Sequence, residues 1–113
     1  MGANAELSRS DVDALPGATL LEFGATWCGV CRATAPTIRS ALAGHPGVRH
    51  LKIEDGAGRP LGRSFGVKLW PTLVFLRDGR ETARLVRPRD VASIGDALAV
   101  IDAPAAATGI ESR

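Results

Sequence analysis

The sequence lacks several features that mark specialised classes of protein. It has no dense Lys/Arg cluster and a formal net charge of only +2, so the charge pattern gives no indication of nucleic-acid binding. No segment approaches the roughly 20 apolar residues that span a bilayer, which argues against a membrane partner. Residues 1–9 contain no continuous apolar stretch of the kind that a signal peptide needs. We therefore expect a cytoplasmic protein.

Cysteine is scarce: Cys28 and Cys31 are the only two in 113 residues, too few for a disulfide scaffold. A bridge between them would close a very small loop and constrain the unfolded chain weakly, which makes a purely structural pair a poor explanation. Zinc or an iron–sulfur cluster would need about four ligands, and the only other soft candidates are His45 and His50. We expect no metal and no separate cofactor, and we favour redox chemistry at the cysteines themselves.

The remaining composition, 45% hydrophobic and 23% charged, is that of a single globular domain, which we place at residues 1–103. Residues 104–113 are predicted to form a disordered tail. Hydrophobic periodicity and turn signals predict alternating strands and helices. In chain order these are an edge strand near 5–7, a helix at 10–15, a strand at 19–23, a helix at 28–43, a strand at 48–53, a short helix at 61–65, a hairpin of strands at 71–76 and 81–86, and a helix from 90 to 101. This order predicts an α/β fold with a terminal hairpin.

Both long helices are predicted to bury an apolar face. In the first, the face contains Val30, Ala33, Ile38, Ala41 and Leu42. In the last, it contains Val91, Ile94, Leu98, Val100 and Ile101. Pro36 lies inside the first helix, where it removes a backbone hydrogen bond and should kink the axis.

The cysteines are predicted to lie at the start of the first long helix. Unpaired N–H groups and the helix dipole favour a thiolate at Cys28, and the spacing puts Cys31 one turn later on the same face. We expect Cys28 to be the exposed nucleophile and Cys31 the more buried thiol that resolves a mixed disulfide. Gly29 leaves space for a partner backbone, and Val30 adds an apolar side chain beside the pair.

Several separated motifs resemble those of the thioredoxin family, over roughly residues 5–101. The run from Ala25 to Cys31 (ATWCGVC) is similar to the active-site segment, and Pro36 matches the proline that kinks the active-site helix. Trp70-Pro71-Thr72 stands where the family has its cis-proline loop. The resemblance implies a thioredoxin fold, with a central mixed sheet of four to five strands flanked by helices.

The resemblance also implies roles for individual residues. Cys28 would attack a substrate disulfide and Cys31 would release it. Pro71, in cis, would face the disulfide and leave the backbone of Trp70 free to pair with a bound peptide. Glu22 would be the buried acid beneath the resolving cysteine, with Lys52 nearby.

Two of these side chains can also be interpreted from the residues alone. A carboxyl group inside an apolar strand, as at Glu22, favours its neutral form and suits proton transfer near neutrality. The alternative is that Glu22 reaches an edge or simply pairs with Lys52. Trp27, beside the thiol, is expected to shield the site.

Four positions depart from the family pattern. Val30 replaces the usual proline, Glu22 replaces an aspartate, Trp70 is bulkier than the usual residue, and Arg87 stands where a glycine is usual. The last two indicate an altered docking surface and favour a dedicated partner.

The sequence thus predicts an enzyme, a monomeric thiol–disulfide oxidoreductase that reduces protein disulfides in electron transport and cell redox homeostasis. Its electrons would come from a thioredoxin reductase or a dedicated redox partner, and its potential should lie nearer about −270 mV than about −120 mV. The alternative is a peptide-binding adaptor or chaperone with non-essential cysteines, in which Trp27, Val30, Trp70 and Pro71 form an apolar patch.

Overall fold

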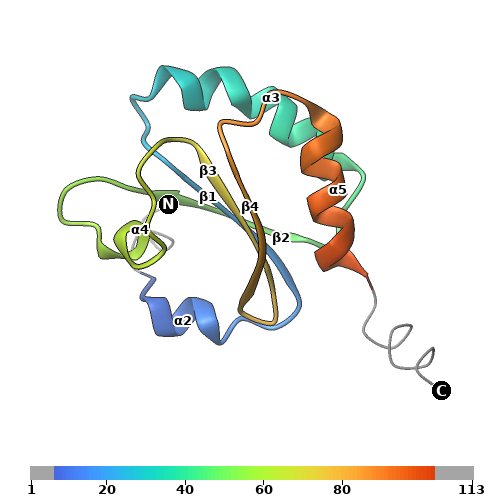
Figure 1. Ribbon diagram of the computed structural model, residues 1–113, viewed down its shortest axis with the longest axis horizontal. Coiled ribbons are helices and arrows are strands. Elements are labelled where there is room, and N and C mark those ends of the chain that lie inside the picture. Colours follow the sequence, from blue (N-terminus) through green and yellow to red (C-terminus); the bar gives the residue numbers. More distant parts are fainter. Residues whose placement is uncertain (1–6, 104–113) are drawn as a thin grey trace.

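The structure, a computed structural model, describes residues 7–103, which form a four-stranded sheet with helices on both faces (Figure 1). The elements in chain order are α2 (Arg9–Asp13), β1 (Ala18–Gly24), α3 (Gly29–Ala43), β2 (Arg49–Glu54), α4 (Pro60–Ser64), β3 (Thr72–Arg77), β4 (Arg80–Val86) and α5 (Val91–Asp102). This order confirms the predicted α/β arrangement. The predicted strand near residues 5–7 lies outside the described residues except for Leu7, which is not in a strand, and the predicted tail lies wholly outside them.

The strands are ordered β2-β1-β3-β4, with β1 parallel to β2 and the other neighbours antiparallel. A parallel pair needs a crossover connection, which α3 provides. The antiparallel hairpin turns at Asp78 and Gly79, whose φ angles of 52° and 80° are those of the tight turn predicted for Asp-Gly. β1 is therefore an inner strand, and it is buried from Ala18 to Phe23.

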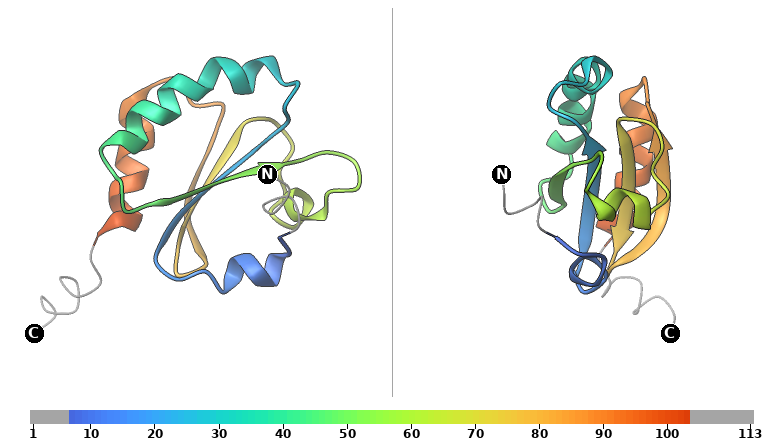
Figure 2. Two further views of the ribbon diagram at one scale, coloured as in Figure 1. Left: turned by 180° about the vertical axis from the view of Figure 1, so that it is seen from behind. Right: turned by 90° about the vertical axis from the view of Figure 1, so that its left-hand side faces the viewer.

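The side chains of β1 contribute to two hydrophobic cores, one on each face of the sheet. Leu20 packs with Phe75 and with Ile38 and Leu98 of α3 and α5. Leu21 and Phe23 face the other side, where they pack with Val12 of α2 and Leu61 of α4. Figure 1 shows α3 with α5 and α2 with α4 on opposite sides of the strands, and the view from behind in Figure 2 shows the same pairing.

The predicted helix faces are wrong at their ends. Val30 and Ala33 are exposed, because they lie in the first turns of α3, and its buried residues are Thr34, Ile38 and Ala41. In α5 the buried stripe is Ile94, Leu98 and Ile101. Val91 and Val100 are exposed, the first in the opening turn and the second off the stripe. Apolar spacing identified the helices but not how far each one overlaps the sheet.

The strand register brings three distant segments to one end of the sheet. Phe23 is opposite Thr72, and Thr72 is opposite Val86. The loop after β1, the segment before β3 and the segment after β4 therefore meet where α3 begins. Among residues 7–103, no helix combines the length and apolarity needed to cross a membrane.

Candidate active site

Cys28 caps the N-terminus of α3 with its own sulfur. The backbone N–H of Cys31 donates to Cys28 Sγ at 3.1 Å, and the Cys28 backbone is extended (φ −81°, ψ 115°). The Cys28 N–H bonds the Ala25 carbonyl, and its own carbonyl accepts the N–H of Arg32. The sequence therefore places the first sulfur at a helix N-terminus, as predicted, where backbone dipoles stabilise a thiolate.

The predicted order of exposure is wrong for the two residues as wholes. Cys28 is only 7% exposed, whereas Cys31 is partly exposed. Cys28 closes the turn from Ala25 as the N-cap of α3, with its N–H and carbonyl both hydrogen-bonded, while Cys31 lies on the first turn of the helix. Both thiols are free, so the site is in its dithiol form.

The two sulfurs nevertheless differ in ionisation as a nucleophile and a resolving thiol should. Burial opposes ionisation of Cys28, but hydrogen bonds from the Cys31 thiol and from the N–H groups of Cys31 and Val30, with the charge of Arg87, hold its pKa below the ordinary value. Burial, the hydrogen bond to Cys28 and the negative charges of Cys28 and Glu22 raise the pKa of Cys31 to about 11. Cys28 is the thiol that ionises first.

Gly24, the last residue of β1, makes room for the second sulfur. A Cβ built at this position would lie 2.8 Å from Cys31 Sγ, closer than such contacts occur. The thiol therefore packs against bare backbone at the end of β1. Glu22 is two residues earlier on the same face of the strand.

The loop before β3 has the predicted cis peptide bond between Trp70 and Pro71. The Trp70 backbone, however, is not as free as the resemblance implied. Its carbonyl accepts a hydrogen bond from Arg87 Nε at 2.7 Å, and the Arg87 N–H donates to the Pro71 carbonyl at 2.9 Å. Arg87 adopts a left-handed backbone (φ 50°), which turns its side chain back over this loop.

Two tryptophans form the apolar part of the surface beside Cys28. Trp27 is 70% exposed and meets Trp70 edge to face, with ring centroids 5.3 Å apart. The Trp70 indole N–H donates to Asp55 Oδ2 at 2.9 Å. Val30 is exposed nearby in the chain, and a Cβ at Gly29 would meet nothing within 4 Å, so this side of the motif is open.

Glu22 is buried, as predicted, and it is bonded to a residue that was not assigned to the site. Its Oε1 is hydrogen-bonded to His50 Nε2 at 2.7 Å, with side-chain exposures of 8% for Glu22 and 27% for His50. Lys52 is opposite Glu22 in the parallel register, yet it is exposed and takes part in none of the ion pairs found in residues 7–103. The alternative in which Glu22 simply pairs with Lys52 is therefore wrong, because the imidazole of His50, two residues earlier on the same face of β2, is bonded to the carboxylate instead.

The structure thus gathers most of the predicted site at one end of the sheet and adds residues that sequence reasoning missed. Gly24, His50 and Asp55 were not assigned to the site. Their signals were weak: a strand-terminal glycine, a histidine on a half-exposed strand, and an acid 15 residues before the tryptophan that it holds. No group of three or more His, Cys, Asp or Glu within the described part of the chain could hold a metal ion.

Comparison with known proteins gives one consistent family. The sequence model of the thioredoxin family matches residues 4–100. The thioredoxin of Chlamydia muridarum is 38% identical over 79 residues, which cover 69% of this chain and 76% of that protein. Protein disulfide-isomerase A2 of Pongo abelii is 41% identical over 85 residues, covering 70% of this chain but only 16% of that longer protein.

A solved structure agrees with the sequence comparison. Thioredoxin 2 from Pseudomonas aeruginosa PAO1, in its reduced form, is similar with a TM-score of 0.77 and 52% sequence identity. The match covers 85% of this chain and 89% of that one. The comparisons give no support to a binding module with non-essential cysteines.

Proposed function

Because this chain belongs to the thioredoxin family and is a thiol–disulfide oxidoreductase, we propose that it reduces protein disulfides by attack of Cys28 and resolution by Cys31. The observation that carries this assignment is the Cys31 N–H bonded to Cys28 Sγ at the start of α3. That bond stabilises a thiolate on one sulfur only. The pKa of the other thiol is raised to about 11, so it remains protonated until the second step.

In the first step, the Cys28 thiolate attacks one sulfur of the substrate disulfide. The substrate S–S bond breaks, a mixed disulfide forms with Cys28, and one substrate sulfur leaves as a thiolate that takes up a proton. In the second step, Cys31 loses its proton and attacks Cys28 Sγ. The second substrate thiolate leaves, the protein keeps the Cys28–Cys31 disulfide, and two electrons have passed to the substrate.

Glu22 and His50 assist the second step in this proposal. The buried Glu22 carboxylate is close enough for its charge to raise the pKa of Cys31, which suits an acceptor for the Cys31 proton. His50, bonded to Glu22 and partly exposed, connects that carboxylate with solvent. Lys52 is exposed on β2, the strand that carries His50, and is assigned only a contribution to the electrostatic field around Glu22.

The substrate docks, in this proposal, over Trp27, Gly29, Val30, Trp70 and Pro71. Trp27 and Val30 are exposed, and open space adjoins Gly29. Desolvating exposed apolar side chains around the nucleophile is favourable and brings a disulfide within reach.

The same proposal covers the setting of the reaction. We place the protein in the cytoplasm as a monomeric electron carrier, because a dithiol reductant needs a reducing compartment. It needs no cofactor beyond its cysteines, and a thioredoxin reductase or another dithiol donor restores the reduced form. Cell fractionation and light scattering test the compartment and the oligomeric state.

Insulin reduction driven by dithiothreitol tests the activity, and a trapping experiment tests the assignment of the cysteines. The Cys31→Ser variant should accumulate a mixed disulfide with substrate, seen as an added mass on Cys28. The Cys28→Ser variant is the matched control and should trap almost nothing. Equal trapping by both variants would reverse or remove the proposed roles.

A further inference from the structure

Arg87 places a positive charge on the docking surface, and only part of its guanidinium group is hydrogen-bonded within the part of the chain that the structure describes. Its Nε is fixed by the Trp70 carbonyl at 2.7 Å, and its backbone N–H is fixed by Pro71. The hydrogen bonds of residues 7–103 include none from the two terminal nitrogens of Arg87. The charge of Arg87 also lowers the pKa of the Cys28 thiol. The guanidinium is thus fixed in place by Nε, while its two terminal nitrogens are available to bind a ligand.

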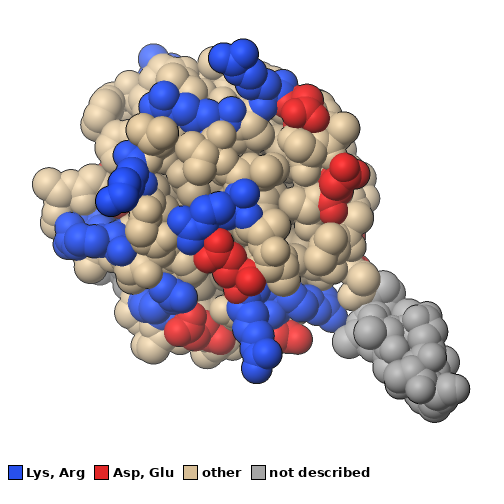
Figure 3. All heavy atoms as spheres, in the orientation of Figure 1, with Lys and Arg blue, Asp and Glu red and all other residues tan. Residues whose placement is uncertain are grey.

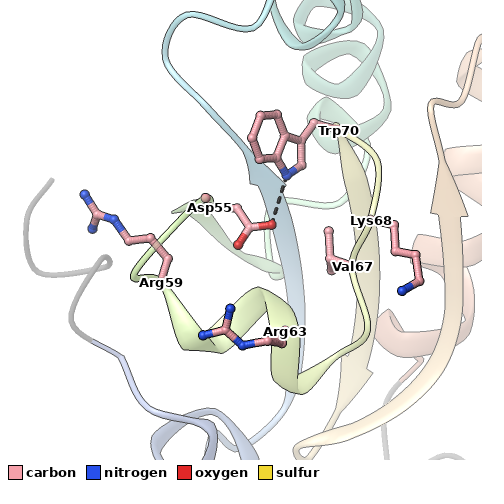
Figure 4. Close-up of a pocket in the computed structure, with 7 residues that line it drawn as sticks. Asp55, Arg59, Arg63, Val67, Lys68 and Trp70 are labelled. Atoms are coloured by element: carbon pink, nitrogen blue, oxygen red, sulfur yellow. Dashed lines mark hydrogen bonds between the residues drawn. The ribbon is translucent and has the colours of Figure 1, made fainter.

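The other end of Trp70 borders a second cationic feature, here called the basic hollow. It is an open hollow of about 320 Å³ lined by Asp55, Gly56, Arg59, Arg63, Val67, Lys68 and Trp70. Figure 4 shows Arg63 near the middle, below Asp55, with Arg59 and Lys68 to either side. In Figure 3, Lys and Arg side chains gather over the left-hand part of the face, where Figure 1 places α4 and its flanking loops.

The cations of the basic hollow are not neutralised within the fold. No ion pair among the described residues includes Arg59, Arg63 or Lys68. The one acid of the hollow, Asp55, is held by the Trp70 indole N–H and lies directly over Gly62, where a Cβ would collide with its carboxyl group. Asp55 therefore anchors the tryptophan, and the hollow keeps an excess of positive charge.

From this arrangement we propose that Arg87 and the basic hollow select protein substrates with acidic side chains flanking the disulfide. The proposal rests on the function proposed above and specifies the class of substrate. A substrate segment lying across Trp70 would meet Arg87 beside the Trp70 main-chain carbonyl and the basic hollow beside the Trp70 indole ring. The terminal nitrogens of Arg87 would take one carboxylate, and Arg63 and Lys68 would take another.

The occupant is a protein segment because exposed apolar side chains adjoin Trp70 and Cys28: Trp27 contacts Trp70, Leu69 precedes it in the chain, and Val30 follows Cys28 by two residues. Trp27, Val30 and Leu69 are 70%, 41% and 49% exposed. A polypeptide supplies both apolar contacts and carboxylates, and the Arg87 bond to the Trp70 carbonyl removes one acceptor that an extended backbone could otherwise use. Side-chain charge replaces part of the backbone recognition in this protein.

Three peptide disulfides of equal length test the proposal, with Glu, Ser or Lys flanking the cysteines. The reduced protein is mixed with each peptide under single-turnover conditions, and oxidation is followed by tryptophan fluorescence. The decisive quantity is the ratio of rate constants for the Glu and Lys peptides. Since both peptides meet the same Cys28, this ratio cancels any change in thiol ionisation.

The variants are Arg87→Gln, and Arg63→Gln with Lys68→Gln. The matched control for the double variant is Arg39→Gln with Arg80→Gln, which also removes two positive charges, from exposed positions on α3 and β4. We expect the Glu/Lys ratio to fall by about threefold for each site cation removed, to stay unchanged in the control, and to shrink at high salt in the native protein. Arg87→Lys should restore part of the preference.

An equal fall in the control variant, or a ratio insensitive to the site variants and to salt, would overturn the acidic-substrate proposal. The Ser peptide separates this failure from a deeper one. If it is reduced normally, only the charge selection is lost. If the native protein reduces none of the three peptides, the proposed function fails as well.

Discussion

At the scale of single residues, the two thiols are made unequal by where their hydrogen bonds point. The Cys31 N–H donates to the Cys28 sulfur, whereas Cys31 Sγ packs against Gly24 and senses the negative charge of Glu22. A pair of cysteines one turn apart therefore contains one stabilised thiolate and one thiol that resists ionisation.

Alkylation measured against pH should separate these two thiols. We expect Cys28 to react with iodoacetamide with a midpoint below 9, because its pKa is lowered, and Cys31 to react only near pH 11. Peptide mass spectrometry assigns each modified residue. The Cys31→Ser variant should keep the first step, and simultaneous alkylation of both cysteines near pH 9 would contradict the assignment.

His50 and Lys52 compete for the role of partner to Glu22, and their variants distinguish them. Replacing His50 by Gln should slow resolution of the mixed disulfide by roughly tenfold, less than the loss of a group that itself takes the proton. It should also change the pH profile of that step, which a purely structural residue would not. Lys52→Gln is the control, and the lifetime of the mixed disulfide is measured by quenching and mass spectrometry. A slow Lys52 variant beside a normal His50 variant would restore the role that the resemblance gave to the lysine.

The sequence predicted those site residues whose chemistry is local. Cys28 at a helix start, and Pro71 with its cis bond, follow from short motifs and their resemblance to a family. His50 could not be found in this way, because its role depends on a carboxylate on a neighbouring strand. Arg87 was identified as a departure, but not its bond to the Trp70 carbonyl, which depends on a left-handed backbone 17 residues away.

At the scale of elements, the β3–β4 turn is fastened to α2. Gly79 has a φ of 80°, and a Cβ there would collide with the backbone carbonyl of Asp13, the last residue of α2. The Asp78 N–H and carboxylate also bond the backbone of Gly17, which precedes β1. The Asp-Gly motif predicted the turn, while its contact with α2 emerged only from the fold.

Substituting Gly79 by Ala should therefore destabilise the protein by roughly 1–3 kcal/mol, the usual cost of a strained backbone. Gly95→Ala in α5 is the matched control, because a Cβ there meets nothing within 4 Å. That variant should be more stable than the native protein by roughly 0.5–1 kcal/mol, since alanine favours a helix. Urea unfolding followed by circular dichroism measures both. Similar effects in the two variants would show that the contact with Asp13 is not important.

At the scale of the whole molecule, the sheet register explains why residues from distant segments act as one site. Phe23, Thr72 and Val86 are aligned across β1, β3 and β4, so the segments carrying Cys28, Pro71 and Arg87 emerge together. The order of elements was predictable because periodicity and turn residues agree along the chain. The overlap of α3 and α5 with the sheet was not, because it depends on packing between elements, as exposed Val30 and Val100 demonstrate.

The redox potential depends on how these segments come together, since Arg87 directly follows β4 and the sheet register brings that segment to the end of the sheet where Cys28 lies. Its charge lowers the pKa of Cys28 and so stabilises the reduced protein. Arg87→Gln should raise that pKa and make the potential more negative, by on the order of 10 mV for a partly screened charge. Equilibration with a glutathione buffer measures the potential of the native protein and the variant.

The pH dependence of this shift is the critical measurement. Above the pKa of Cys28, the Cys28 sulfur of the reduced native protein is a thiolate, and loss of the Arg87 charge changes the redox potential by its full amount. At lower pH both thiols are protonated in both proteins, so the two potentials should converge. Arg39→Gln removes an exposed charge from α3 and should leave the potential unchanged at every pH. A shift of equal size at all pH values would mean that Arg87 acts on the potential through the fold of the cis-proline loop and not through its charge on the thiolate.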